Sequence, residues 1–237
     1  MENTEFNVVP SLTESGELAK NFMAKVFTWM AAALFISGIT AWMFGTSSLI
    51  TLLVGETGMT PLGYVVLFAP LGFVLLMSFG FNRLSAPLLI LCFLVYSILT
   101  GMSLSFIFLV YTAGSIYSIF AIAGGMFGVM AIAGYTTNTD LTKFGSLMVM
   151  ALFGLVIATV INAFMHSEQF SYILSFVGVL VFTGLTAYDV QKLKRIGSGA
   201  EYGTENTQKL AILGALSLYL DFVNLFLYLL RLFGRRR

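Results

Sequence analysis

Residues 210–232 read LAILGALSLYLDFVNLFLYLLRL. The stretch is long enough to cross a bilayer, which requires about 20 mostly apolar residues. Apart from Arg231 near its end, its only charged side chain is Asp221, close to the middle. A carboxyl group at the centre of a span costs about 2.5–3.5 kcal/mol even on a lenient insertion scale, so it has to face other helices. The stretch therefore predicts a membrane helix inside a bundle.

Six further apolar stretches precede this one. The chain is 58% hydrophobic and 10% charged, against about 45–50% and 25% for a soluble domain, so a water-soluble surface cannot be built from it. The seven predicted spans are residues 26–44, 61–79, 87–110, 115–133, 144–164, 172–188 and 210–232. We expect an all-α integral membrane protein. It has one domain, residues 23–237, after a polar cytoplasmic segment, residues 1–22.

Basic residues are unevenly distributed among the connections. Eight lie before the first span or in alternate connections after it: Lys20, Lys25, Arg83, Lys143, Lys192, Lys194, Arg195 and Lys209. The other connections, 45–60, 111–114 and 165–171, contain no Lys or Arg. Because basic loops stay in the cytoplasm, the amino terminus is predicted to be cytoplasmic.

The basic tail conflicts with this rule. Seven crossings place its arginines outside the cell: Arg231, Arg235, Arg236 and Arg237. Either the tail is a tolerated exception, in which the arginines anchor the last span at anionic head groups, or one stretch is re-entrant. The sequence leaves both open.

Two carboxyl groups are the main candidates for function. Asp221 lies in the last span, and Asn224, three residues later, shares its face. Asp189 ends the sixth span, directly after Tyr188. Each aspartate also has a structural interpretation, Asp221 as a buried hydrogen-bonded carboxyl and Asp189 as an interfacial ion pair with Lys192.

Arg83 is the only basic residue between the second and third spans. Its guanidinium could clamp a carboxylate, or it could serve only to orient the protein. If the sixth span continues to about residue 196 and the last begins near residue 206, Asp189 and Asp221 lie about 7 and 15 residues from the turn. Their depths then differ by roughly 12 Å, so pairing requires a tilt, a bend or a recessed connection.

Glycines recur within the predicted spans. Gly124 and Gly128 form a GxxxG pattern, and Gly145 and Gly154 belong to the following span. Small residues let membrane helices approach closely. We expect these four glycines to pack against neighbouring helices.

Several functions lack the residues they require. Cys92 is the only cysteine and His166 the only histidine, so neither a disulfide nor a cysteine or histidine metal cluster can form within the chain. A net charge of +1 gives no basic face for nucleic acid. Tyr188 and Asp189 fit half of an intramembrane aspartyl protease site, but Asp221 follows LYL instead of the required Gly-x-Gly. We expect no enzyme activity, no cofactor and no nucleic-acid partner.

Three segments carry a family resemblance. They are GLTAYDVQKLK at 184–194, ILGALSLYLDFVNLF at 212–226 with LLR at 229–231, and GYTT at 134–137 with DL at 140–141. The chain resembles the Bax inhibitor-1 (transmembrane Bax inhibitor motif) family, above all its bacterial inner-membrane branch. The resemblance covers nearly the whole chain beyond the polar amino-terminal segment.

The resemblance implies six helices around a central seventh and a pH-sensitive calcium leak in the bacterial inner membrane. Asp189 and Asp221 match the family's pair of aspartates, and Arg83 matches a basic residue that engages the pair. Carboxyl groups that meet share one proton and titrate as a unit, and their ionised oxygens suit transient Ca²⁺ binding. We expect Ca²⁺ and H⁺ as ligands, permeation that increases with pH, and Asn224 and Tyr188 as supporting residues.

A second interpretation belongs to another class of function. The protein would be a non-conducting regulator that binds other membrane proteins, such as a membrane protease or stress machinery. The predicted lumen is mostly apolar and lacks a continuous line of polar residues, which favours this interpretation. The lipid bilayer is the one partner that both interpretations require.

Overall fold

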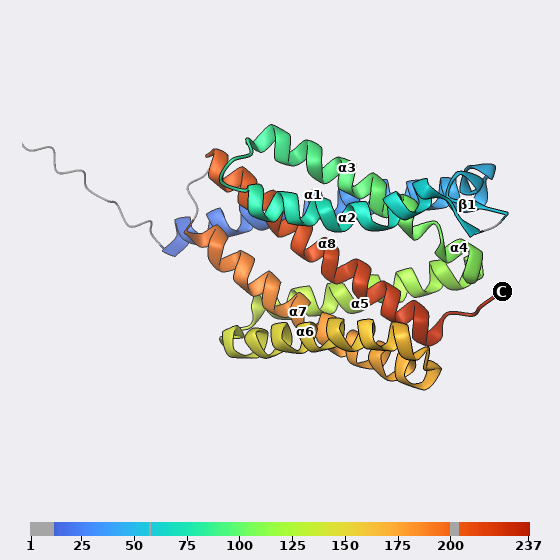
Figure 1. The fold of residues 1–237 in the computed structure, drawn as a ribbon. Helices are drawn as coiled ribbons and strands as arrows, with labels where there is room; N and C mark the ends of the chain where they lie inside the picture. Colours follow the sequence, from blue (N-terminus) through green and yellow to red (C-terminus); the bar gives the residue numbers. More distant parts are fainter. Residues whose placement is uncertain (1–11, 57, 200–203) are drawn as a thin grey trace, which may run out of the picture.

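The computed structural model describes residues 12–56, 58–199 and 204–237. Figure 1 shows long helices that run side by side between the two ends of the molecule. Within the described residues, seven helical segments are long and apolar enough to cross a membrane. The predicted all-α membrane fold is confirmed.

The helices follow one another with short connections. They are α1 (Leu12–Thr46), α2 (Pro61–Gly80), α3 (Ala86–Leu104), α4 (Ile107–Val110), α5 (Ala113–Thr136), α6 (Thr142–Met165), α7 (Glu168–Ser198) and α8 (Glu205–Phe233). A 3₁₀ turn, η1 (Ser48–Leu52), and a hairpin of β1 (Val54–Gly55) and β2 (Gly58–Met59) join α1 to α2. The short α4 continues from α3, so that the two form the third span.

α1 is longer than the sequence predicts. It begins at Leu12 instead of near residue 26, so residues 12–22 of the predicted polar segment are helical. Phe22 is buried and lies against Gly197 near the end of α7. This apolar contact lies beyond the predicted span and extends the packed part of the helix toward its start. The predicted boundary between residues 22 and 23 stays a prediction, and residues 1–11 lie outside the described residues.

α8 occupies the centre of the bundle, as predicted for the last span. It packs against α1, α3, α5 and α7, and 67% of its most apolar window is buried, the largest share of the seven spans. α2 packs on α3, and α6 packs on α7, so both lie further out. The two predicted aspartates are therefore on the central helix and on α7, its most extensive neighbour, whereas Arg83 lies in the turn between α2 and α3.

The tail lies at the opposite end of the bundle from the start of α1 (Figure 1). Its backbone pairs with the connection between α4 and α5: Tyr111 and Arg236 form a β-bridge, and the Arg237 amide donates to the Val110 carbonyl over 2.9 Å. That connection belongs to the group without Lys or Arg. The fold therefore agrees with seven crossings and an exceptional tail, while the side that faces the cytoplasm stays a prediction.

The expected glycine packing is wrong for three of four positions. A Cβ atom added at Gly124, Gly128 or Gly154 would meet nothing within 4 Å, whereas one at Gly145 would lie 2.2 Å from the Tyr188 ring. The reason on α5 is that its buried face carries larger side chains: Ile116, Ile119, Ala123, Phe127 and Ala131. The GxxxG pattern faces away from the rest of the chain.

Candidate carboxylate site on the last two helices

Asp221 is enclosed on α8. The side chain is only 6% exposed, and its Oδ2 atom has no hydrogen-bond partner among the described residues. Leu218 and Leu225, one turn to either side, are fully buried. A buried polar atom without a partner costs about 1–3 kcal/mol, and such atoms are rare in native proteins. An uncompensated carboxyl at this depth is therefore a candidate functional group.

Asp189 of α7 reaches the same part of α8. The Ser217 hydroxyl donates a hydrogen bond to Asp189 Oδ2. Ser217 precedes Asp221 by four residues, so both project from one face of α8, about 6 Å apart along the axis. This offset is half the depth difference predicted from sequence. If both aspartates are ionised, their negative charges repel each other.

Glycines bring three helices close to the Asp189 segment. A Cβ atom at Gly134 of α5 would lie 2.2 Å from the Ala187 carbonyl oxygen, and one at Gly214 of α8 would lie 2.6 Å from Leu193 Cδ2. Gly145 of α6 makes the corresponding approach to Tyr188. Close packing on three sides holds this part of α7 in place against α8.

Arg83 is not brought to the aspartate pair. Its side chain is exposed in the turn between α2 and α3, and it forms no ion pair within the described part of the chain. Three residues later, the Ala86 amide donates to Glu205 Oε1 over 3.0 Å, which places this turn beside the first residue of α8. Ser217 lies twelve residues further along α8, roughly 18 Å away. A clamp by Arg83 stays a prediction that requires a different arrangement.

The two predicted supporting residues contact other groups. The Tyr188 ring packs on Gly145 and lies 6.0 Å from Lys192 Nζ. Asn224 donates to the Leu220 carbonyl of its own helix over 2.8 Å. Between Asp189 and Lys192 there is no ion pair in the described structure, so the alternative interpretation of Asp189 as an interfacial ion pair is not seen.

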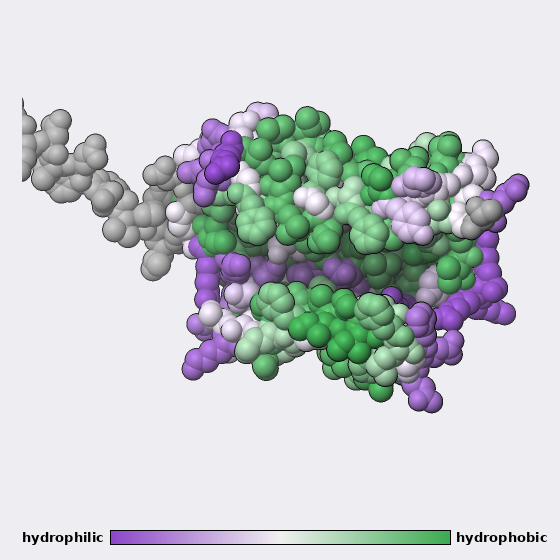
Figure 2. All heavy atoms as spheres, viewed as in Figure 1, coloured by the Kyte–Doolittle hydropathy of each residue, from purple (hydrophilic) through white to green (hydrophobic). Residues whose placement is uncertain are grey.

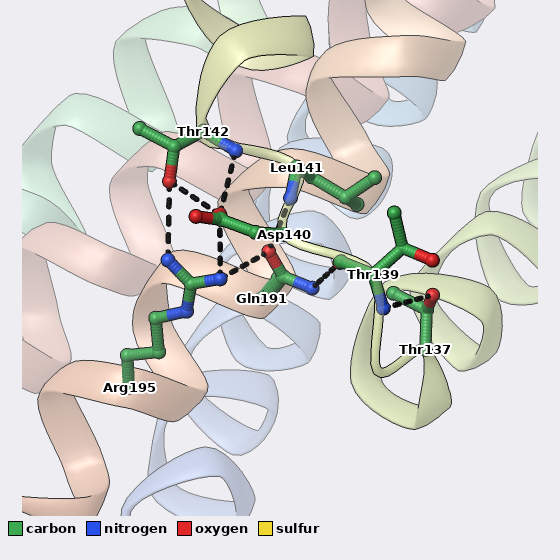
Figure 3. A network of polar contacts seen from close by, with 7 residues as sticks. All are labelled: Thr137, Thr139, Asp140, Leu141, Thr142, Gln191 and Arg195. Atoms are coloured by element: carbon green, nitrogen blue, oxygen red, sulfur yellow. Dashed lines mark hydrogen bonds and ion pairs between the residues drawn. The ribbon is translucent and has the colours of Figure 1, made fainter.

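A polar network next to Asp189 was not predicted as a site (Figure 3). Gln191 is buried on α7; its Oε1 accepts from the Leu141 amide over 2.9 Å, and its Nε2 donates to the Thr139 carbonyl over 2.8 Å. One side chain thereby satisfies two backbone groups of the α5–α6 connection. Both Gln191 and Leu141 belong to the segments that carry the family resemblance. That resemblance was the sequence feature from which the network could have been found.

Asp140 and Arg195 complete this network at the surface. Arg195 donates to Asp140 Oδ1 over 2.7 Å and to Gln191 Oε1 over 2.9 Å. Hydrogen bonds from the hydroxyl and amide of Thr142, together with Arg195, hold the pKa of the Asp140 carboxyl well below its ordinary value. Because the ion pair is exposed, it adds little stability and serves mainly to orient the connection.

A second unpredicted network lies at the centre of the bundle. The Ser37 and Tyr219 hydroxyls are 2.6 Å apart, and the Ser37 hydroxyl lies 2.8 Å from the Ser97 carbonyl oxygen. These residues come from α1, α8 and α3, and all three are at most 1% exposed. The network fixes α8 against α1 and α3, on the part of its circumference that α7 does not cover.

The carboxylate site supplies few ligands for a cation. The described residues contain no group of three or more His, Cys, Asp or Glu side chains placed to hold a metal ion. Calcium normally takes six to eight oxygen ligands. Two aspartates and the Ser217 hydroxyl would therefore need water or backbone carbonyls to complete the shell, so these residues alone do not form a tight calcium site.

Comparison with known proteins agrees with this architecture. Residues 19–237 match the family model described as inhibitor of apoptosis-promoting Bax1. The chain is 44% identical over 219 residues to the inner membrane protein YbhL of Escherichia coli strain K12, covering 92% of this chain and 93% of that protein. It is 42% identical over 221 residues to a Borreliella burgdorferi protein, covering 93% of this chain and 94% of that protein. The chain is thus a multi-pass membrane protein of the Bax inhibitor-1 family.

Proposed function

We propose that this protein is a pH-sensitive leak for Ca²⁺ or other cations in the bacterial inner membrane, gated by Asp189 and Asp221. The observation that carries the proposal is the buried Asp221, with an unpartnered oxygen, one helical turn from the Ser217 hydroxyl that binds Asp189. Two carboxyl groups this close cannot both ionise freely, so they titrate together.

In the closed state of this mechanism the pair holds a proton and α7 stays packed on α8. Loss of the proton leaves two negative charges in a region of low dielectric, where their repulsion is strong. The repulsion favours separation of α7 from α8 and turns carboxylate oxygens toward the gap. Oxygen ligands of this kind attract a divalent cation, so permeation increases with pH.

A hollow along α8 supplies a polar approach to the pair. Figure 2 shows it between the α2–α3 and α6–α7 layers, with hydrophilic residues on its floor over α8. Ser217, Leu220 and Asn224, which share one face of α8, are each partly exposed. Asp189 is partly exposed as well, so in this mechanism the hollow leads an ion to Asp189 first, and the enclosed Asp221 becomes accessible when α7 separates from α8.

Calcium flux into liposomes tests this mechanism. The purified full chain is reconstituted and compared with Asp189→Asn, Asp221→Asn and the double variant between pH 6 and 8. Wild-type flux should rise with pH, and the double variant should lose that dependence. Glu168→Gln is the matched control, since it makes the same change at an exposed position on α7. A double variant that responds to pH like the wild type would reject the gate.

The hollow in Figure 2 also favours a second candidate, a non-conducting regulator that binds another membrane protein. A polar stripe that faces lipid is costly, and a partner helix that covers it would satisfy its groups. Absence of flux from correctly folded, inserted protein would favour this candidate. Neither function requires chemistry on a substrate. Under both, the amino terminus is placed in the cytoplasm by the basic connections.

A further inference from the structure

A second hollow lies on another side of α8, between α1 and α5. These two helices each pack on α7 and α8 but make minimal contact with each other, so a space is left between them. The space has a volume of about 770 Å³, and its lining includes Phe35 and Trp42 of α1, Tyr117 and Phe120 of α5, and Phe226 of α8. Lipid-facing side chains such as Phe35 and Trp42 are 69% and 52% exposed, so the hollow opens toward the membrane.

The dimensions of this hollow suit one acyl chain. Its lining on α1 runs from Ala31 to Trp42, eleven residue steps or roughly 16 Å along the helix. The hydrocarbon of one leaflet is about 15 Å thick, half of the full core. The volume also lies within the range of about 300–1,000 Å³ that is usual for small-molecule sites.

One end of the hollow is next to the arginine tail. Phe108 of α4 lines that end, and the residues directly after α4 pair with the tail, where the Thr112 amide donates to the Arg235 carbonyl over 3.0 Å. The Arg235 amide in turn donates to Ser115 Oγ over 2.9 Å. The backbone of the tail is thus fixed at the mouth of the hollow instead of trailing into solvent.

The tail arginines have no acidic partner among the described residues. All four are exposed, and none forms an ion pair with another described residue. The acidic residues placed by the connections at this end are Glu56 and Glu168, both exposed. If the seven helices cross the membrane as expected, these guanidinium ions lie at the level of the head groups, where they are complementary to phosphate, which arginine binds through paired donors.

We propose that the hollow between α1 and α5 holds an acyl chain of an anionic phospholipid whose phosphate binds the tail arginines. The site combines an apolar channel of one-leaflet length with fixed positive charge at its mouth. It also gives the tail a function where the positive-inside rule predicts no basic residues.

Fluorescence quenching of Trp42 by brominated lipid tests this site. The chain has two tryptophans, and Trp29→Phe leaves Trp42, which lines the hollow. The full-length Trp29→Phe protein is reconstituted in phosphatidylcholine with increasing amounts of brominated phosphatidylglycerol or brominated phosphatidylcholine. The anionic lipid should reach half-maximal quenching at about a tenfold lower mole fraction, because each nearby basic residue favours it. Equal quenching by the two lipids would overturn the proposal.

Variants separate the head group from the acyl chain. Arg235→Gln, Arg236→Gln and Arg237→Gln together should remove the preference, while the same three changes to Lys, which keep the charge, should retain most of it. Gly38→Leu should fill the hollow and reduce quenching by the anionic lipid, because Gly38 lines it and has free space at its Cβ position. Gly154→Leu, which faces free space on α6, should leave quenching unchanged. The proposed site is wrong if the triple Gln variant keeps its preference for the anionic lipid. It is also wrong if Trp42 of the Gly38→Leu variant is quenched as strongly as Trp42 of the Trp29→Phe parent.

Discussion

The Ser217 hydroxyl of α8 hydrogen-bonds to the Asp189 carboxylate of α7. This contact sets the level of Asp189 one helical turn from Asp221, and it is the only side-chain hydrogen bond that either aspartate forms with another described residue. Ser217 therefore controls how the two carboxyl groups face each other across the helix interface.

Replacing Ser217 by Ala should loosen this interface. The change removes one hydrogen bond, about 0.5–1.5 kcal/mol between neutral groups and about 1.5–3 kcal/mol to a charged one. Under the proposed gate, calcium flux at pH 6 should rise toward the level seen at pH 8. Ser118→Ala is the control, since Ser118 is exposed on α5 and donates only to the Gly114 carbonyl of its own helix. Unchanged flux at pH 6 in Ser217→Ala would argue against a role for this contact in closure.

Gln191→Ala should destabilise the connection between α5 and α6. It removes the partner of the Leu141 amide and the Thr139 carbonyl, at a cost of about 1–3 kcal/mol. Thermal unfolding in detergent should show a lower midpoint, and hydrogen exchange should be faster at Leu141. Gln169→Ala, an exposed glutamine on the same helix, should change neither. Similar effects from both variants would mean that the network in Figure 3 does not fix the connection.

The Asp140 contacts should be insensitive to pH across the range proposed for gating. Because the folded-state pKa of Asp140 is lowered, its stabilisation is fully present above its ordinary value, about 3.9, and is lost only as pH falls through the lower, folded value. The protection of the amides of residues 139–142, measured as exchange corrected for its intrinsic dependence on pH, should therefore stay constant from pH 8 to 5 and be lost only in strong acid. Asp140→Asn should leave the pH response of calcium flux intact between pH 6 and 8. If Asp140→Asn shifts the pH at which calcium flux is half-maximal, the group that senses pH would lie at the α5–α6 connection.

Two glycine substitutions on α5 should have opposite effects. Gly134→Ala places a Cβ atom 2.2 Å from a backbone carbonyl of α7, so the helices have to separate at a cost of about 1–3 kcal/mol. Gly124→Ala adds a Cβ atom in open space and should be neutral or stabilising by up to about 1 kcal/mol, because alanine favours helix. Unfolding of both variants under identical detergent conditions provides the comparison. A destabilising Gly124→Ala would show that the GxxxG face has a packing partner.

The spans and the inward orientation of Asp221 could be predicted from the residues, whereas the central position of the last span was implied by the family resemblance. Seven apolar stretches of membrane length have little alternative to helix, and the cost of a carboxyl in lipid requires Asp221 to face inward. The same reasoning identified Asp189 as a candidate but did not identify Ser217, its hydrogen-bond donor. Ser217 is an ordinary small residue in a span, and its bond to Asp189 depends on how far α7 and α8 are displaced along each other.

Other features depend on which face of a helix is buried, which an apolar span does not reveal. Gly124 and Gly128 have the spacing of a packing motif, yet Phe127 beside them is buried while they face outward. Gln191 lies in a segment singled out by resemblance, but its partners are backbone atoms some 50 residues away. Arg83 was selected for its charge and for its match to a basic residue of the family, and the Ala86–Glu205 contact places its turn beside the first residue of α8.

The contacts at the two ends of α8 restrict how it can move. At the start of α8, the side chain of Glu205 accepts a hydrogen bond from the amide of Ala86, where the third span begins. Beyond the last turn of α8, the amide of Arg237 donates to the carbonyl of Val110, where the third span ends. The third span and α8 are thus hydrogen-bonded to each other at both ends. Sliding of α8 along the membrane normal would break both joints at once. Under the proposed gate, the displacement that parts the aspartates would therefore fall to α7, which would move sideways against a stationary α8.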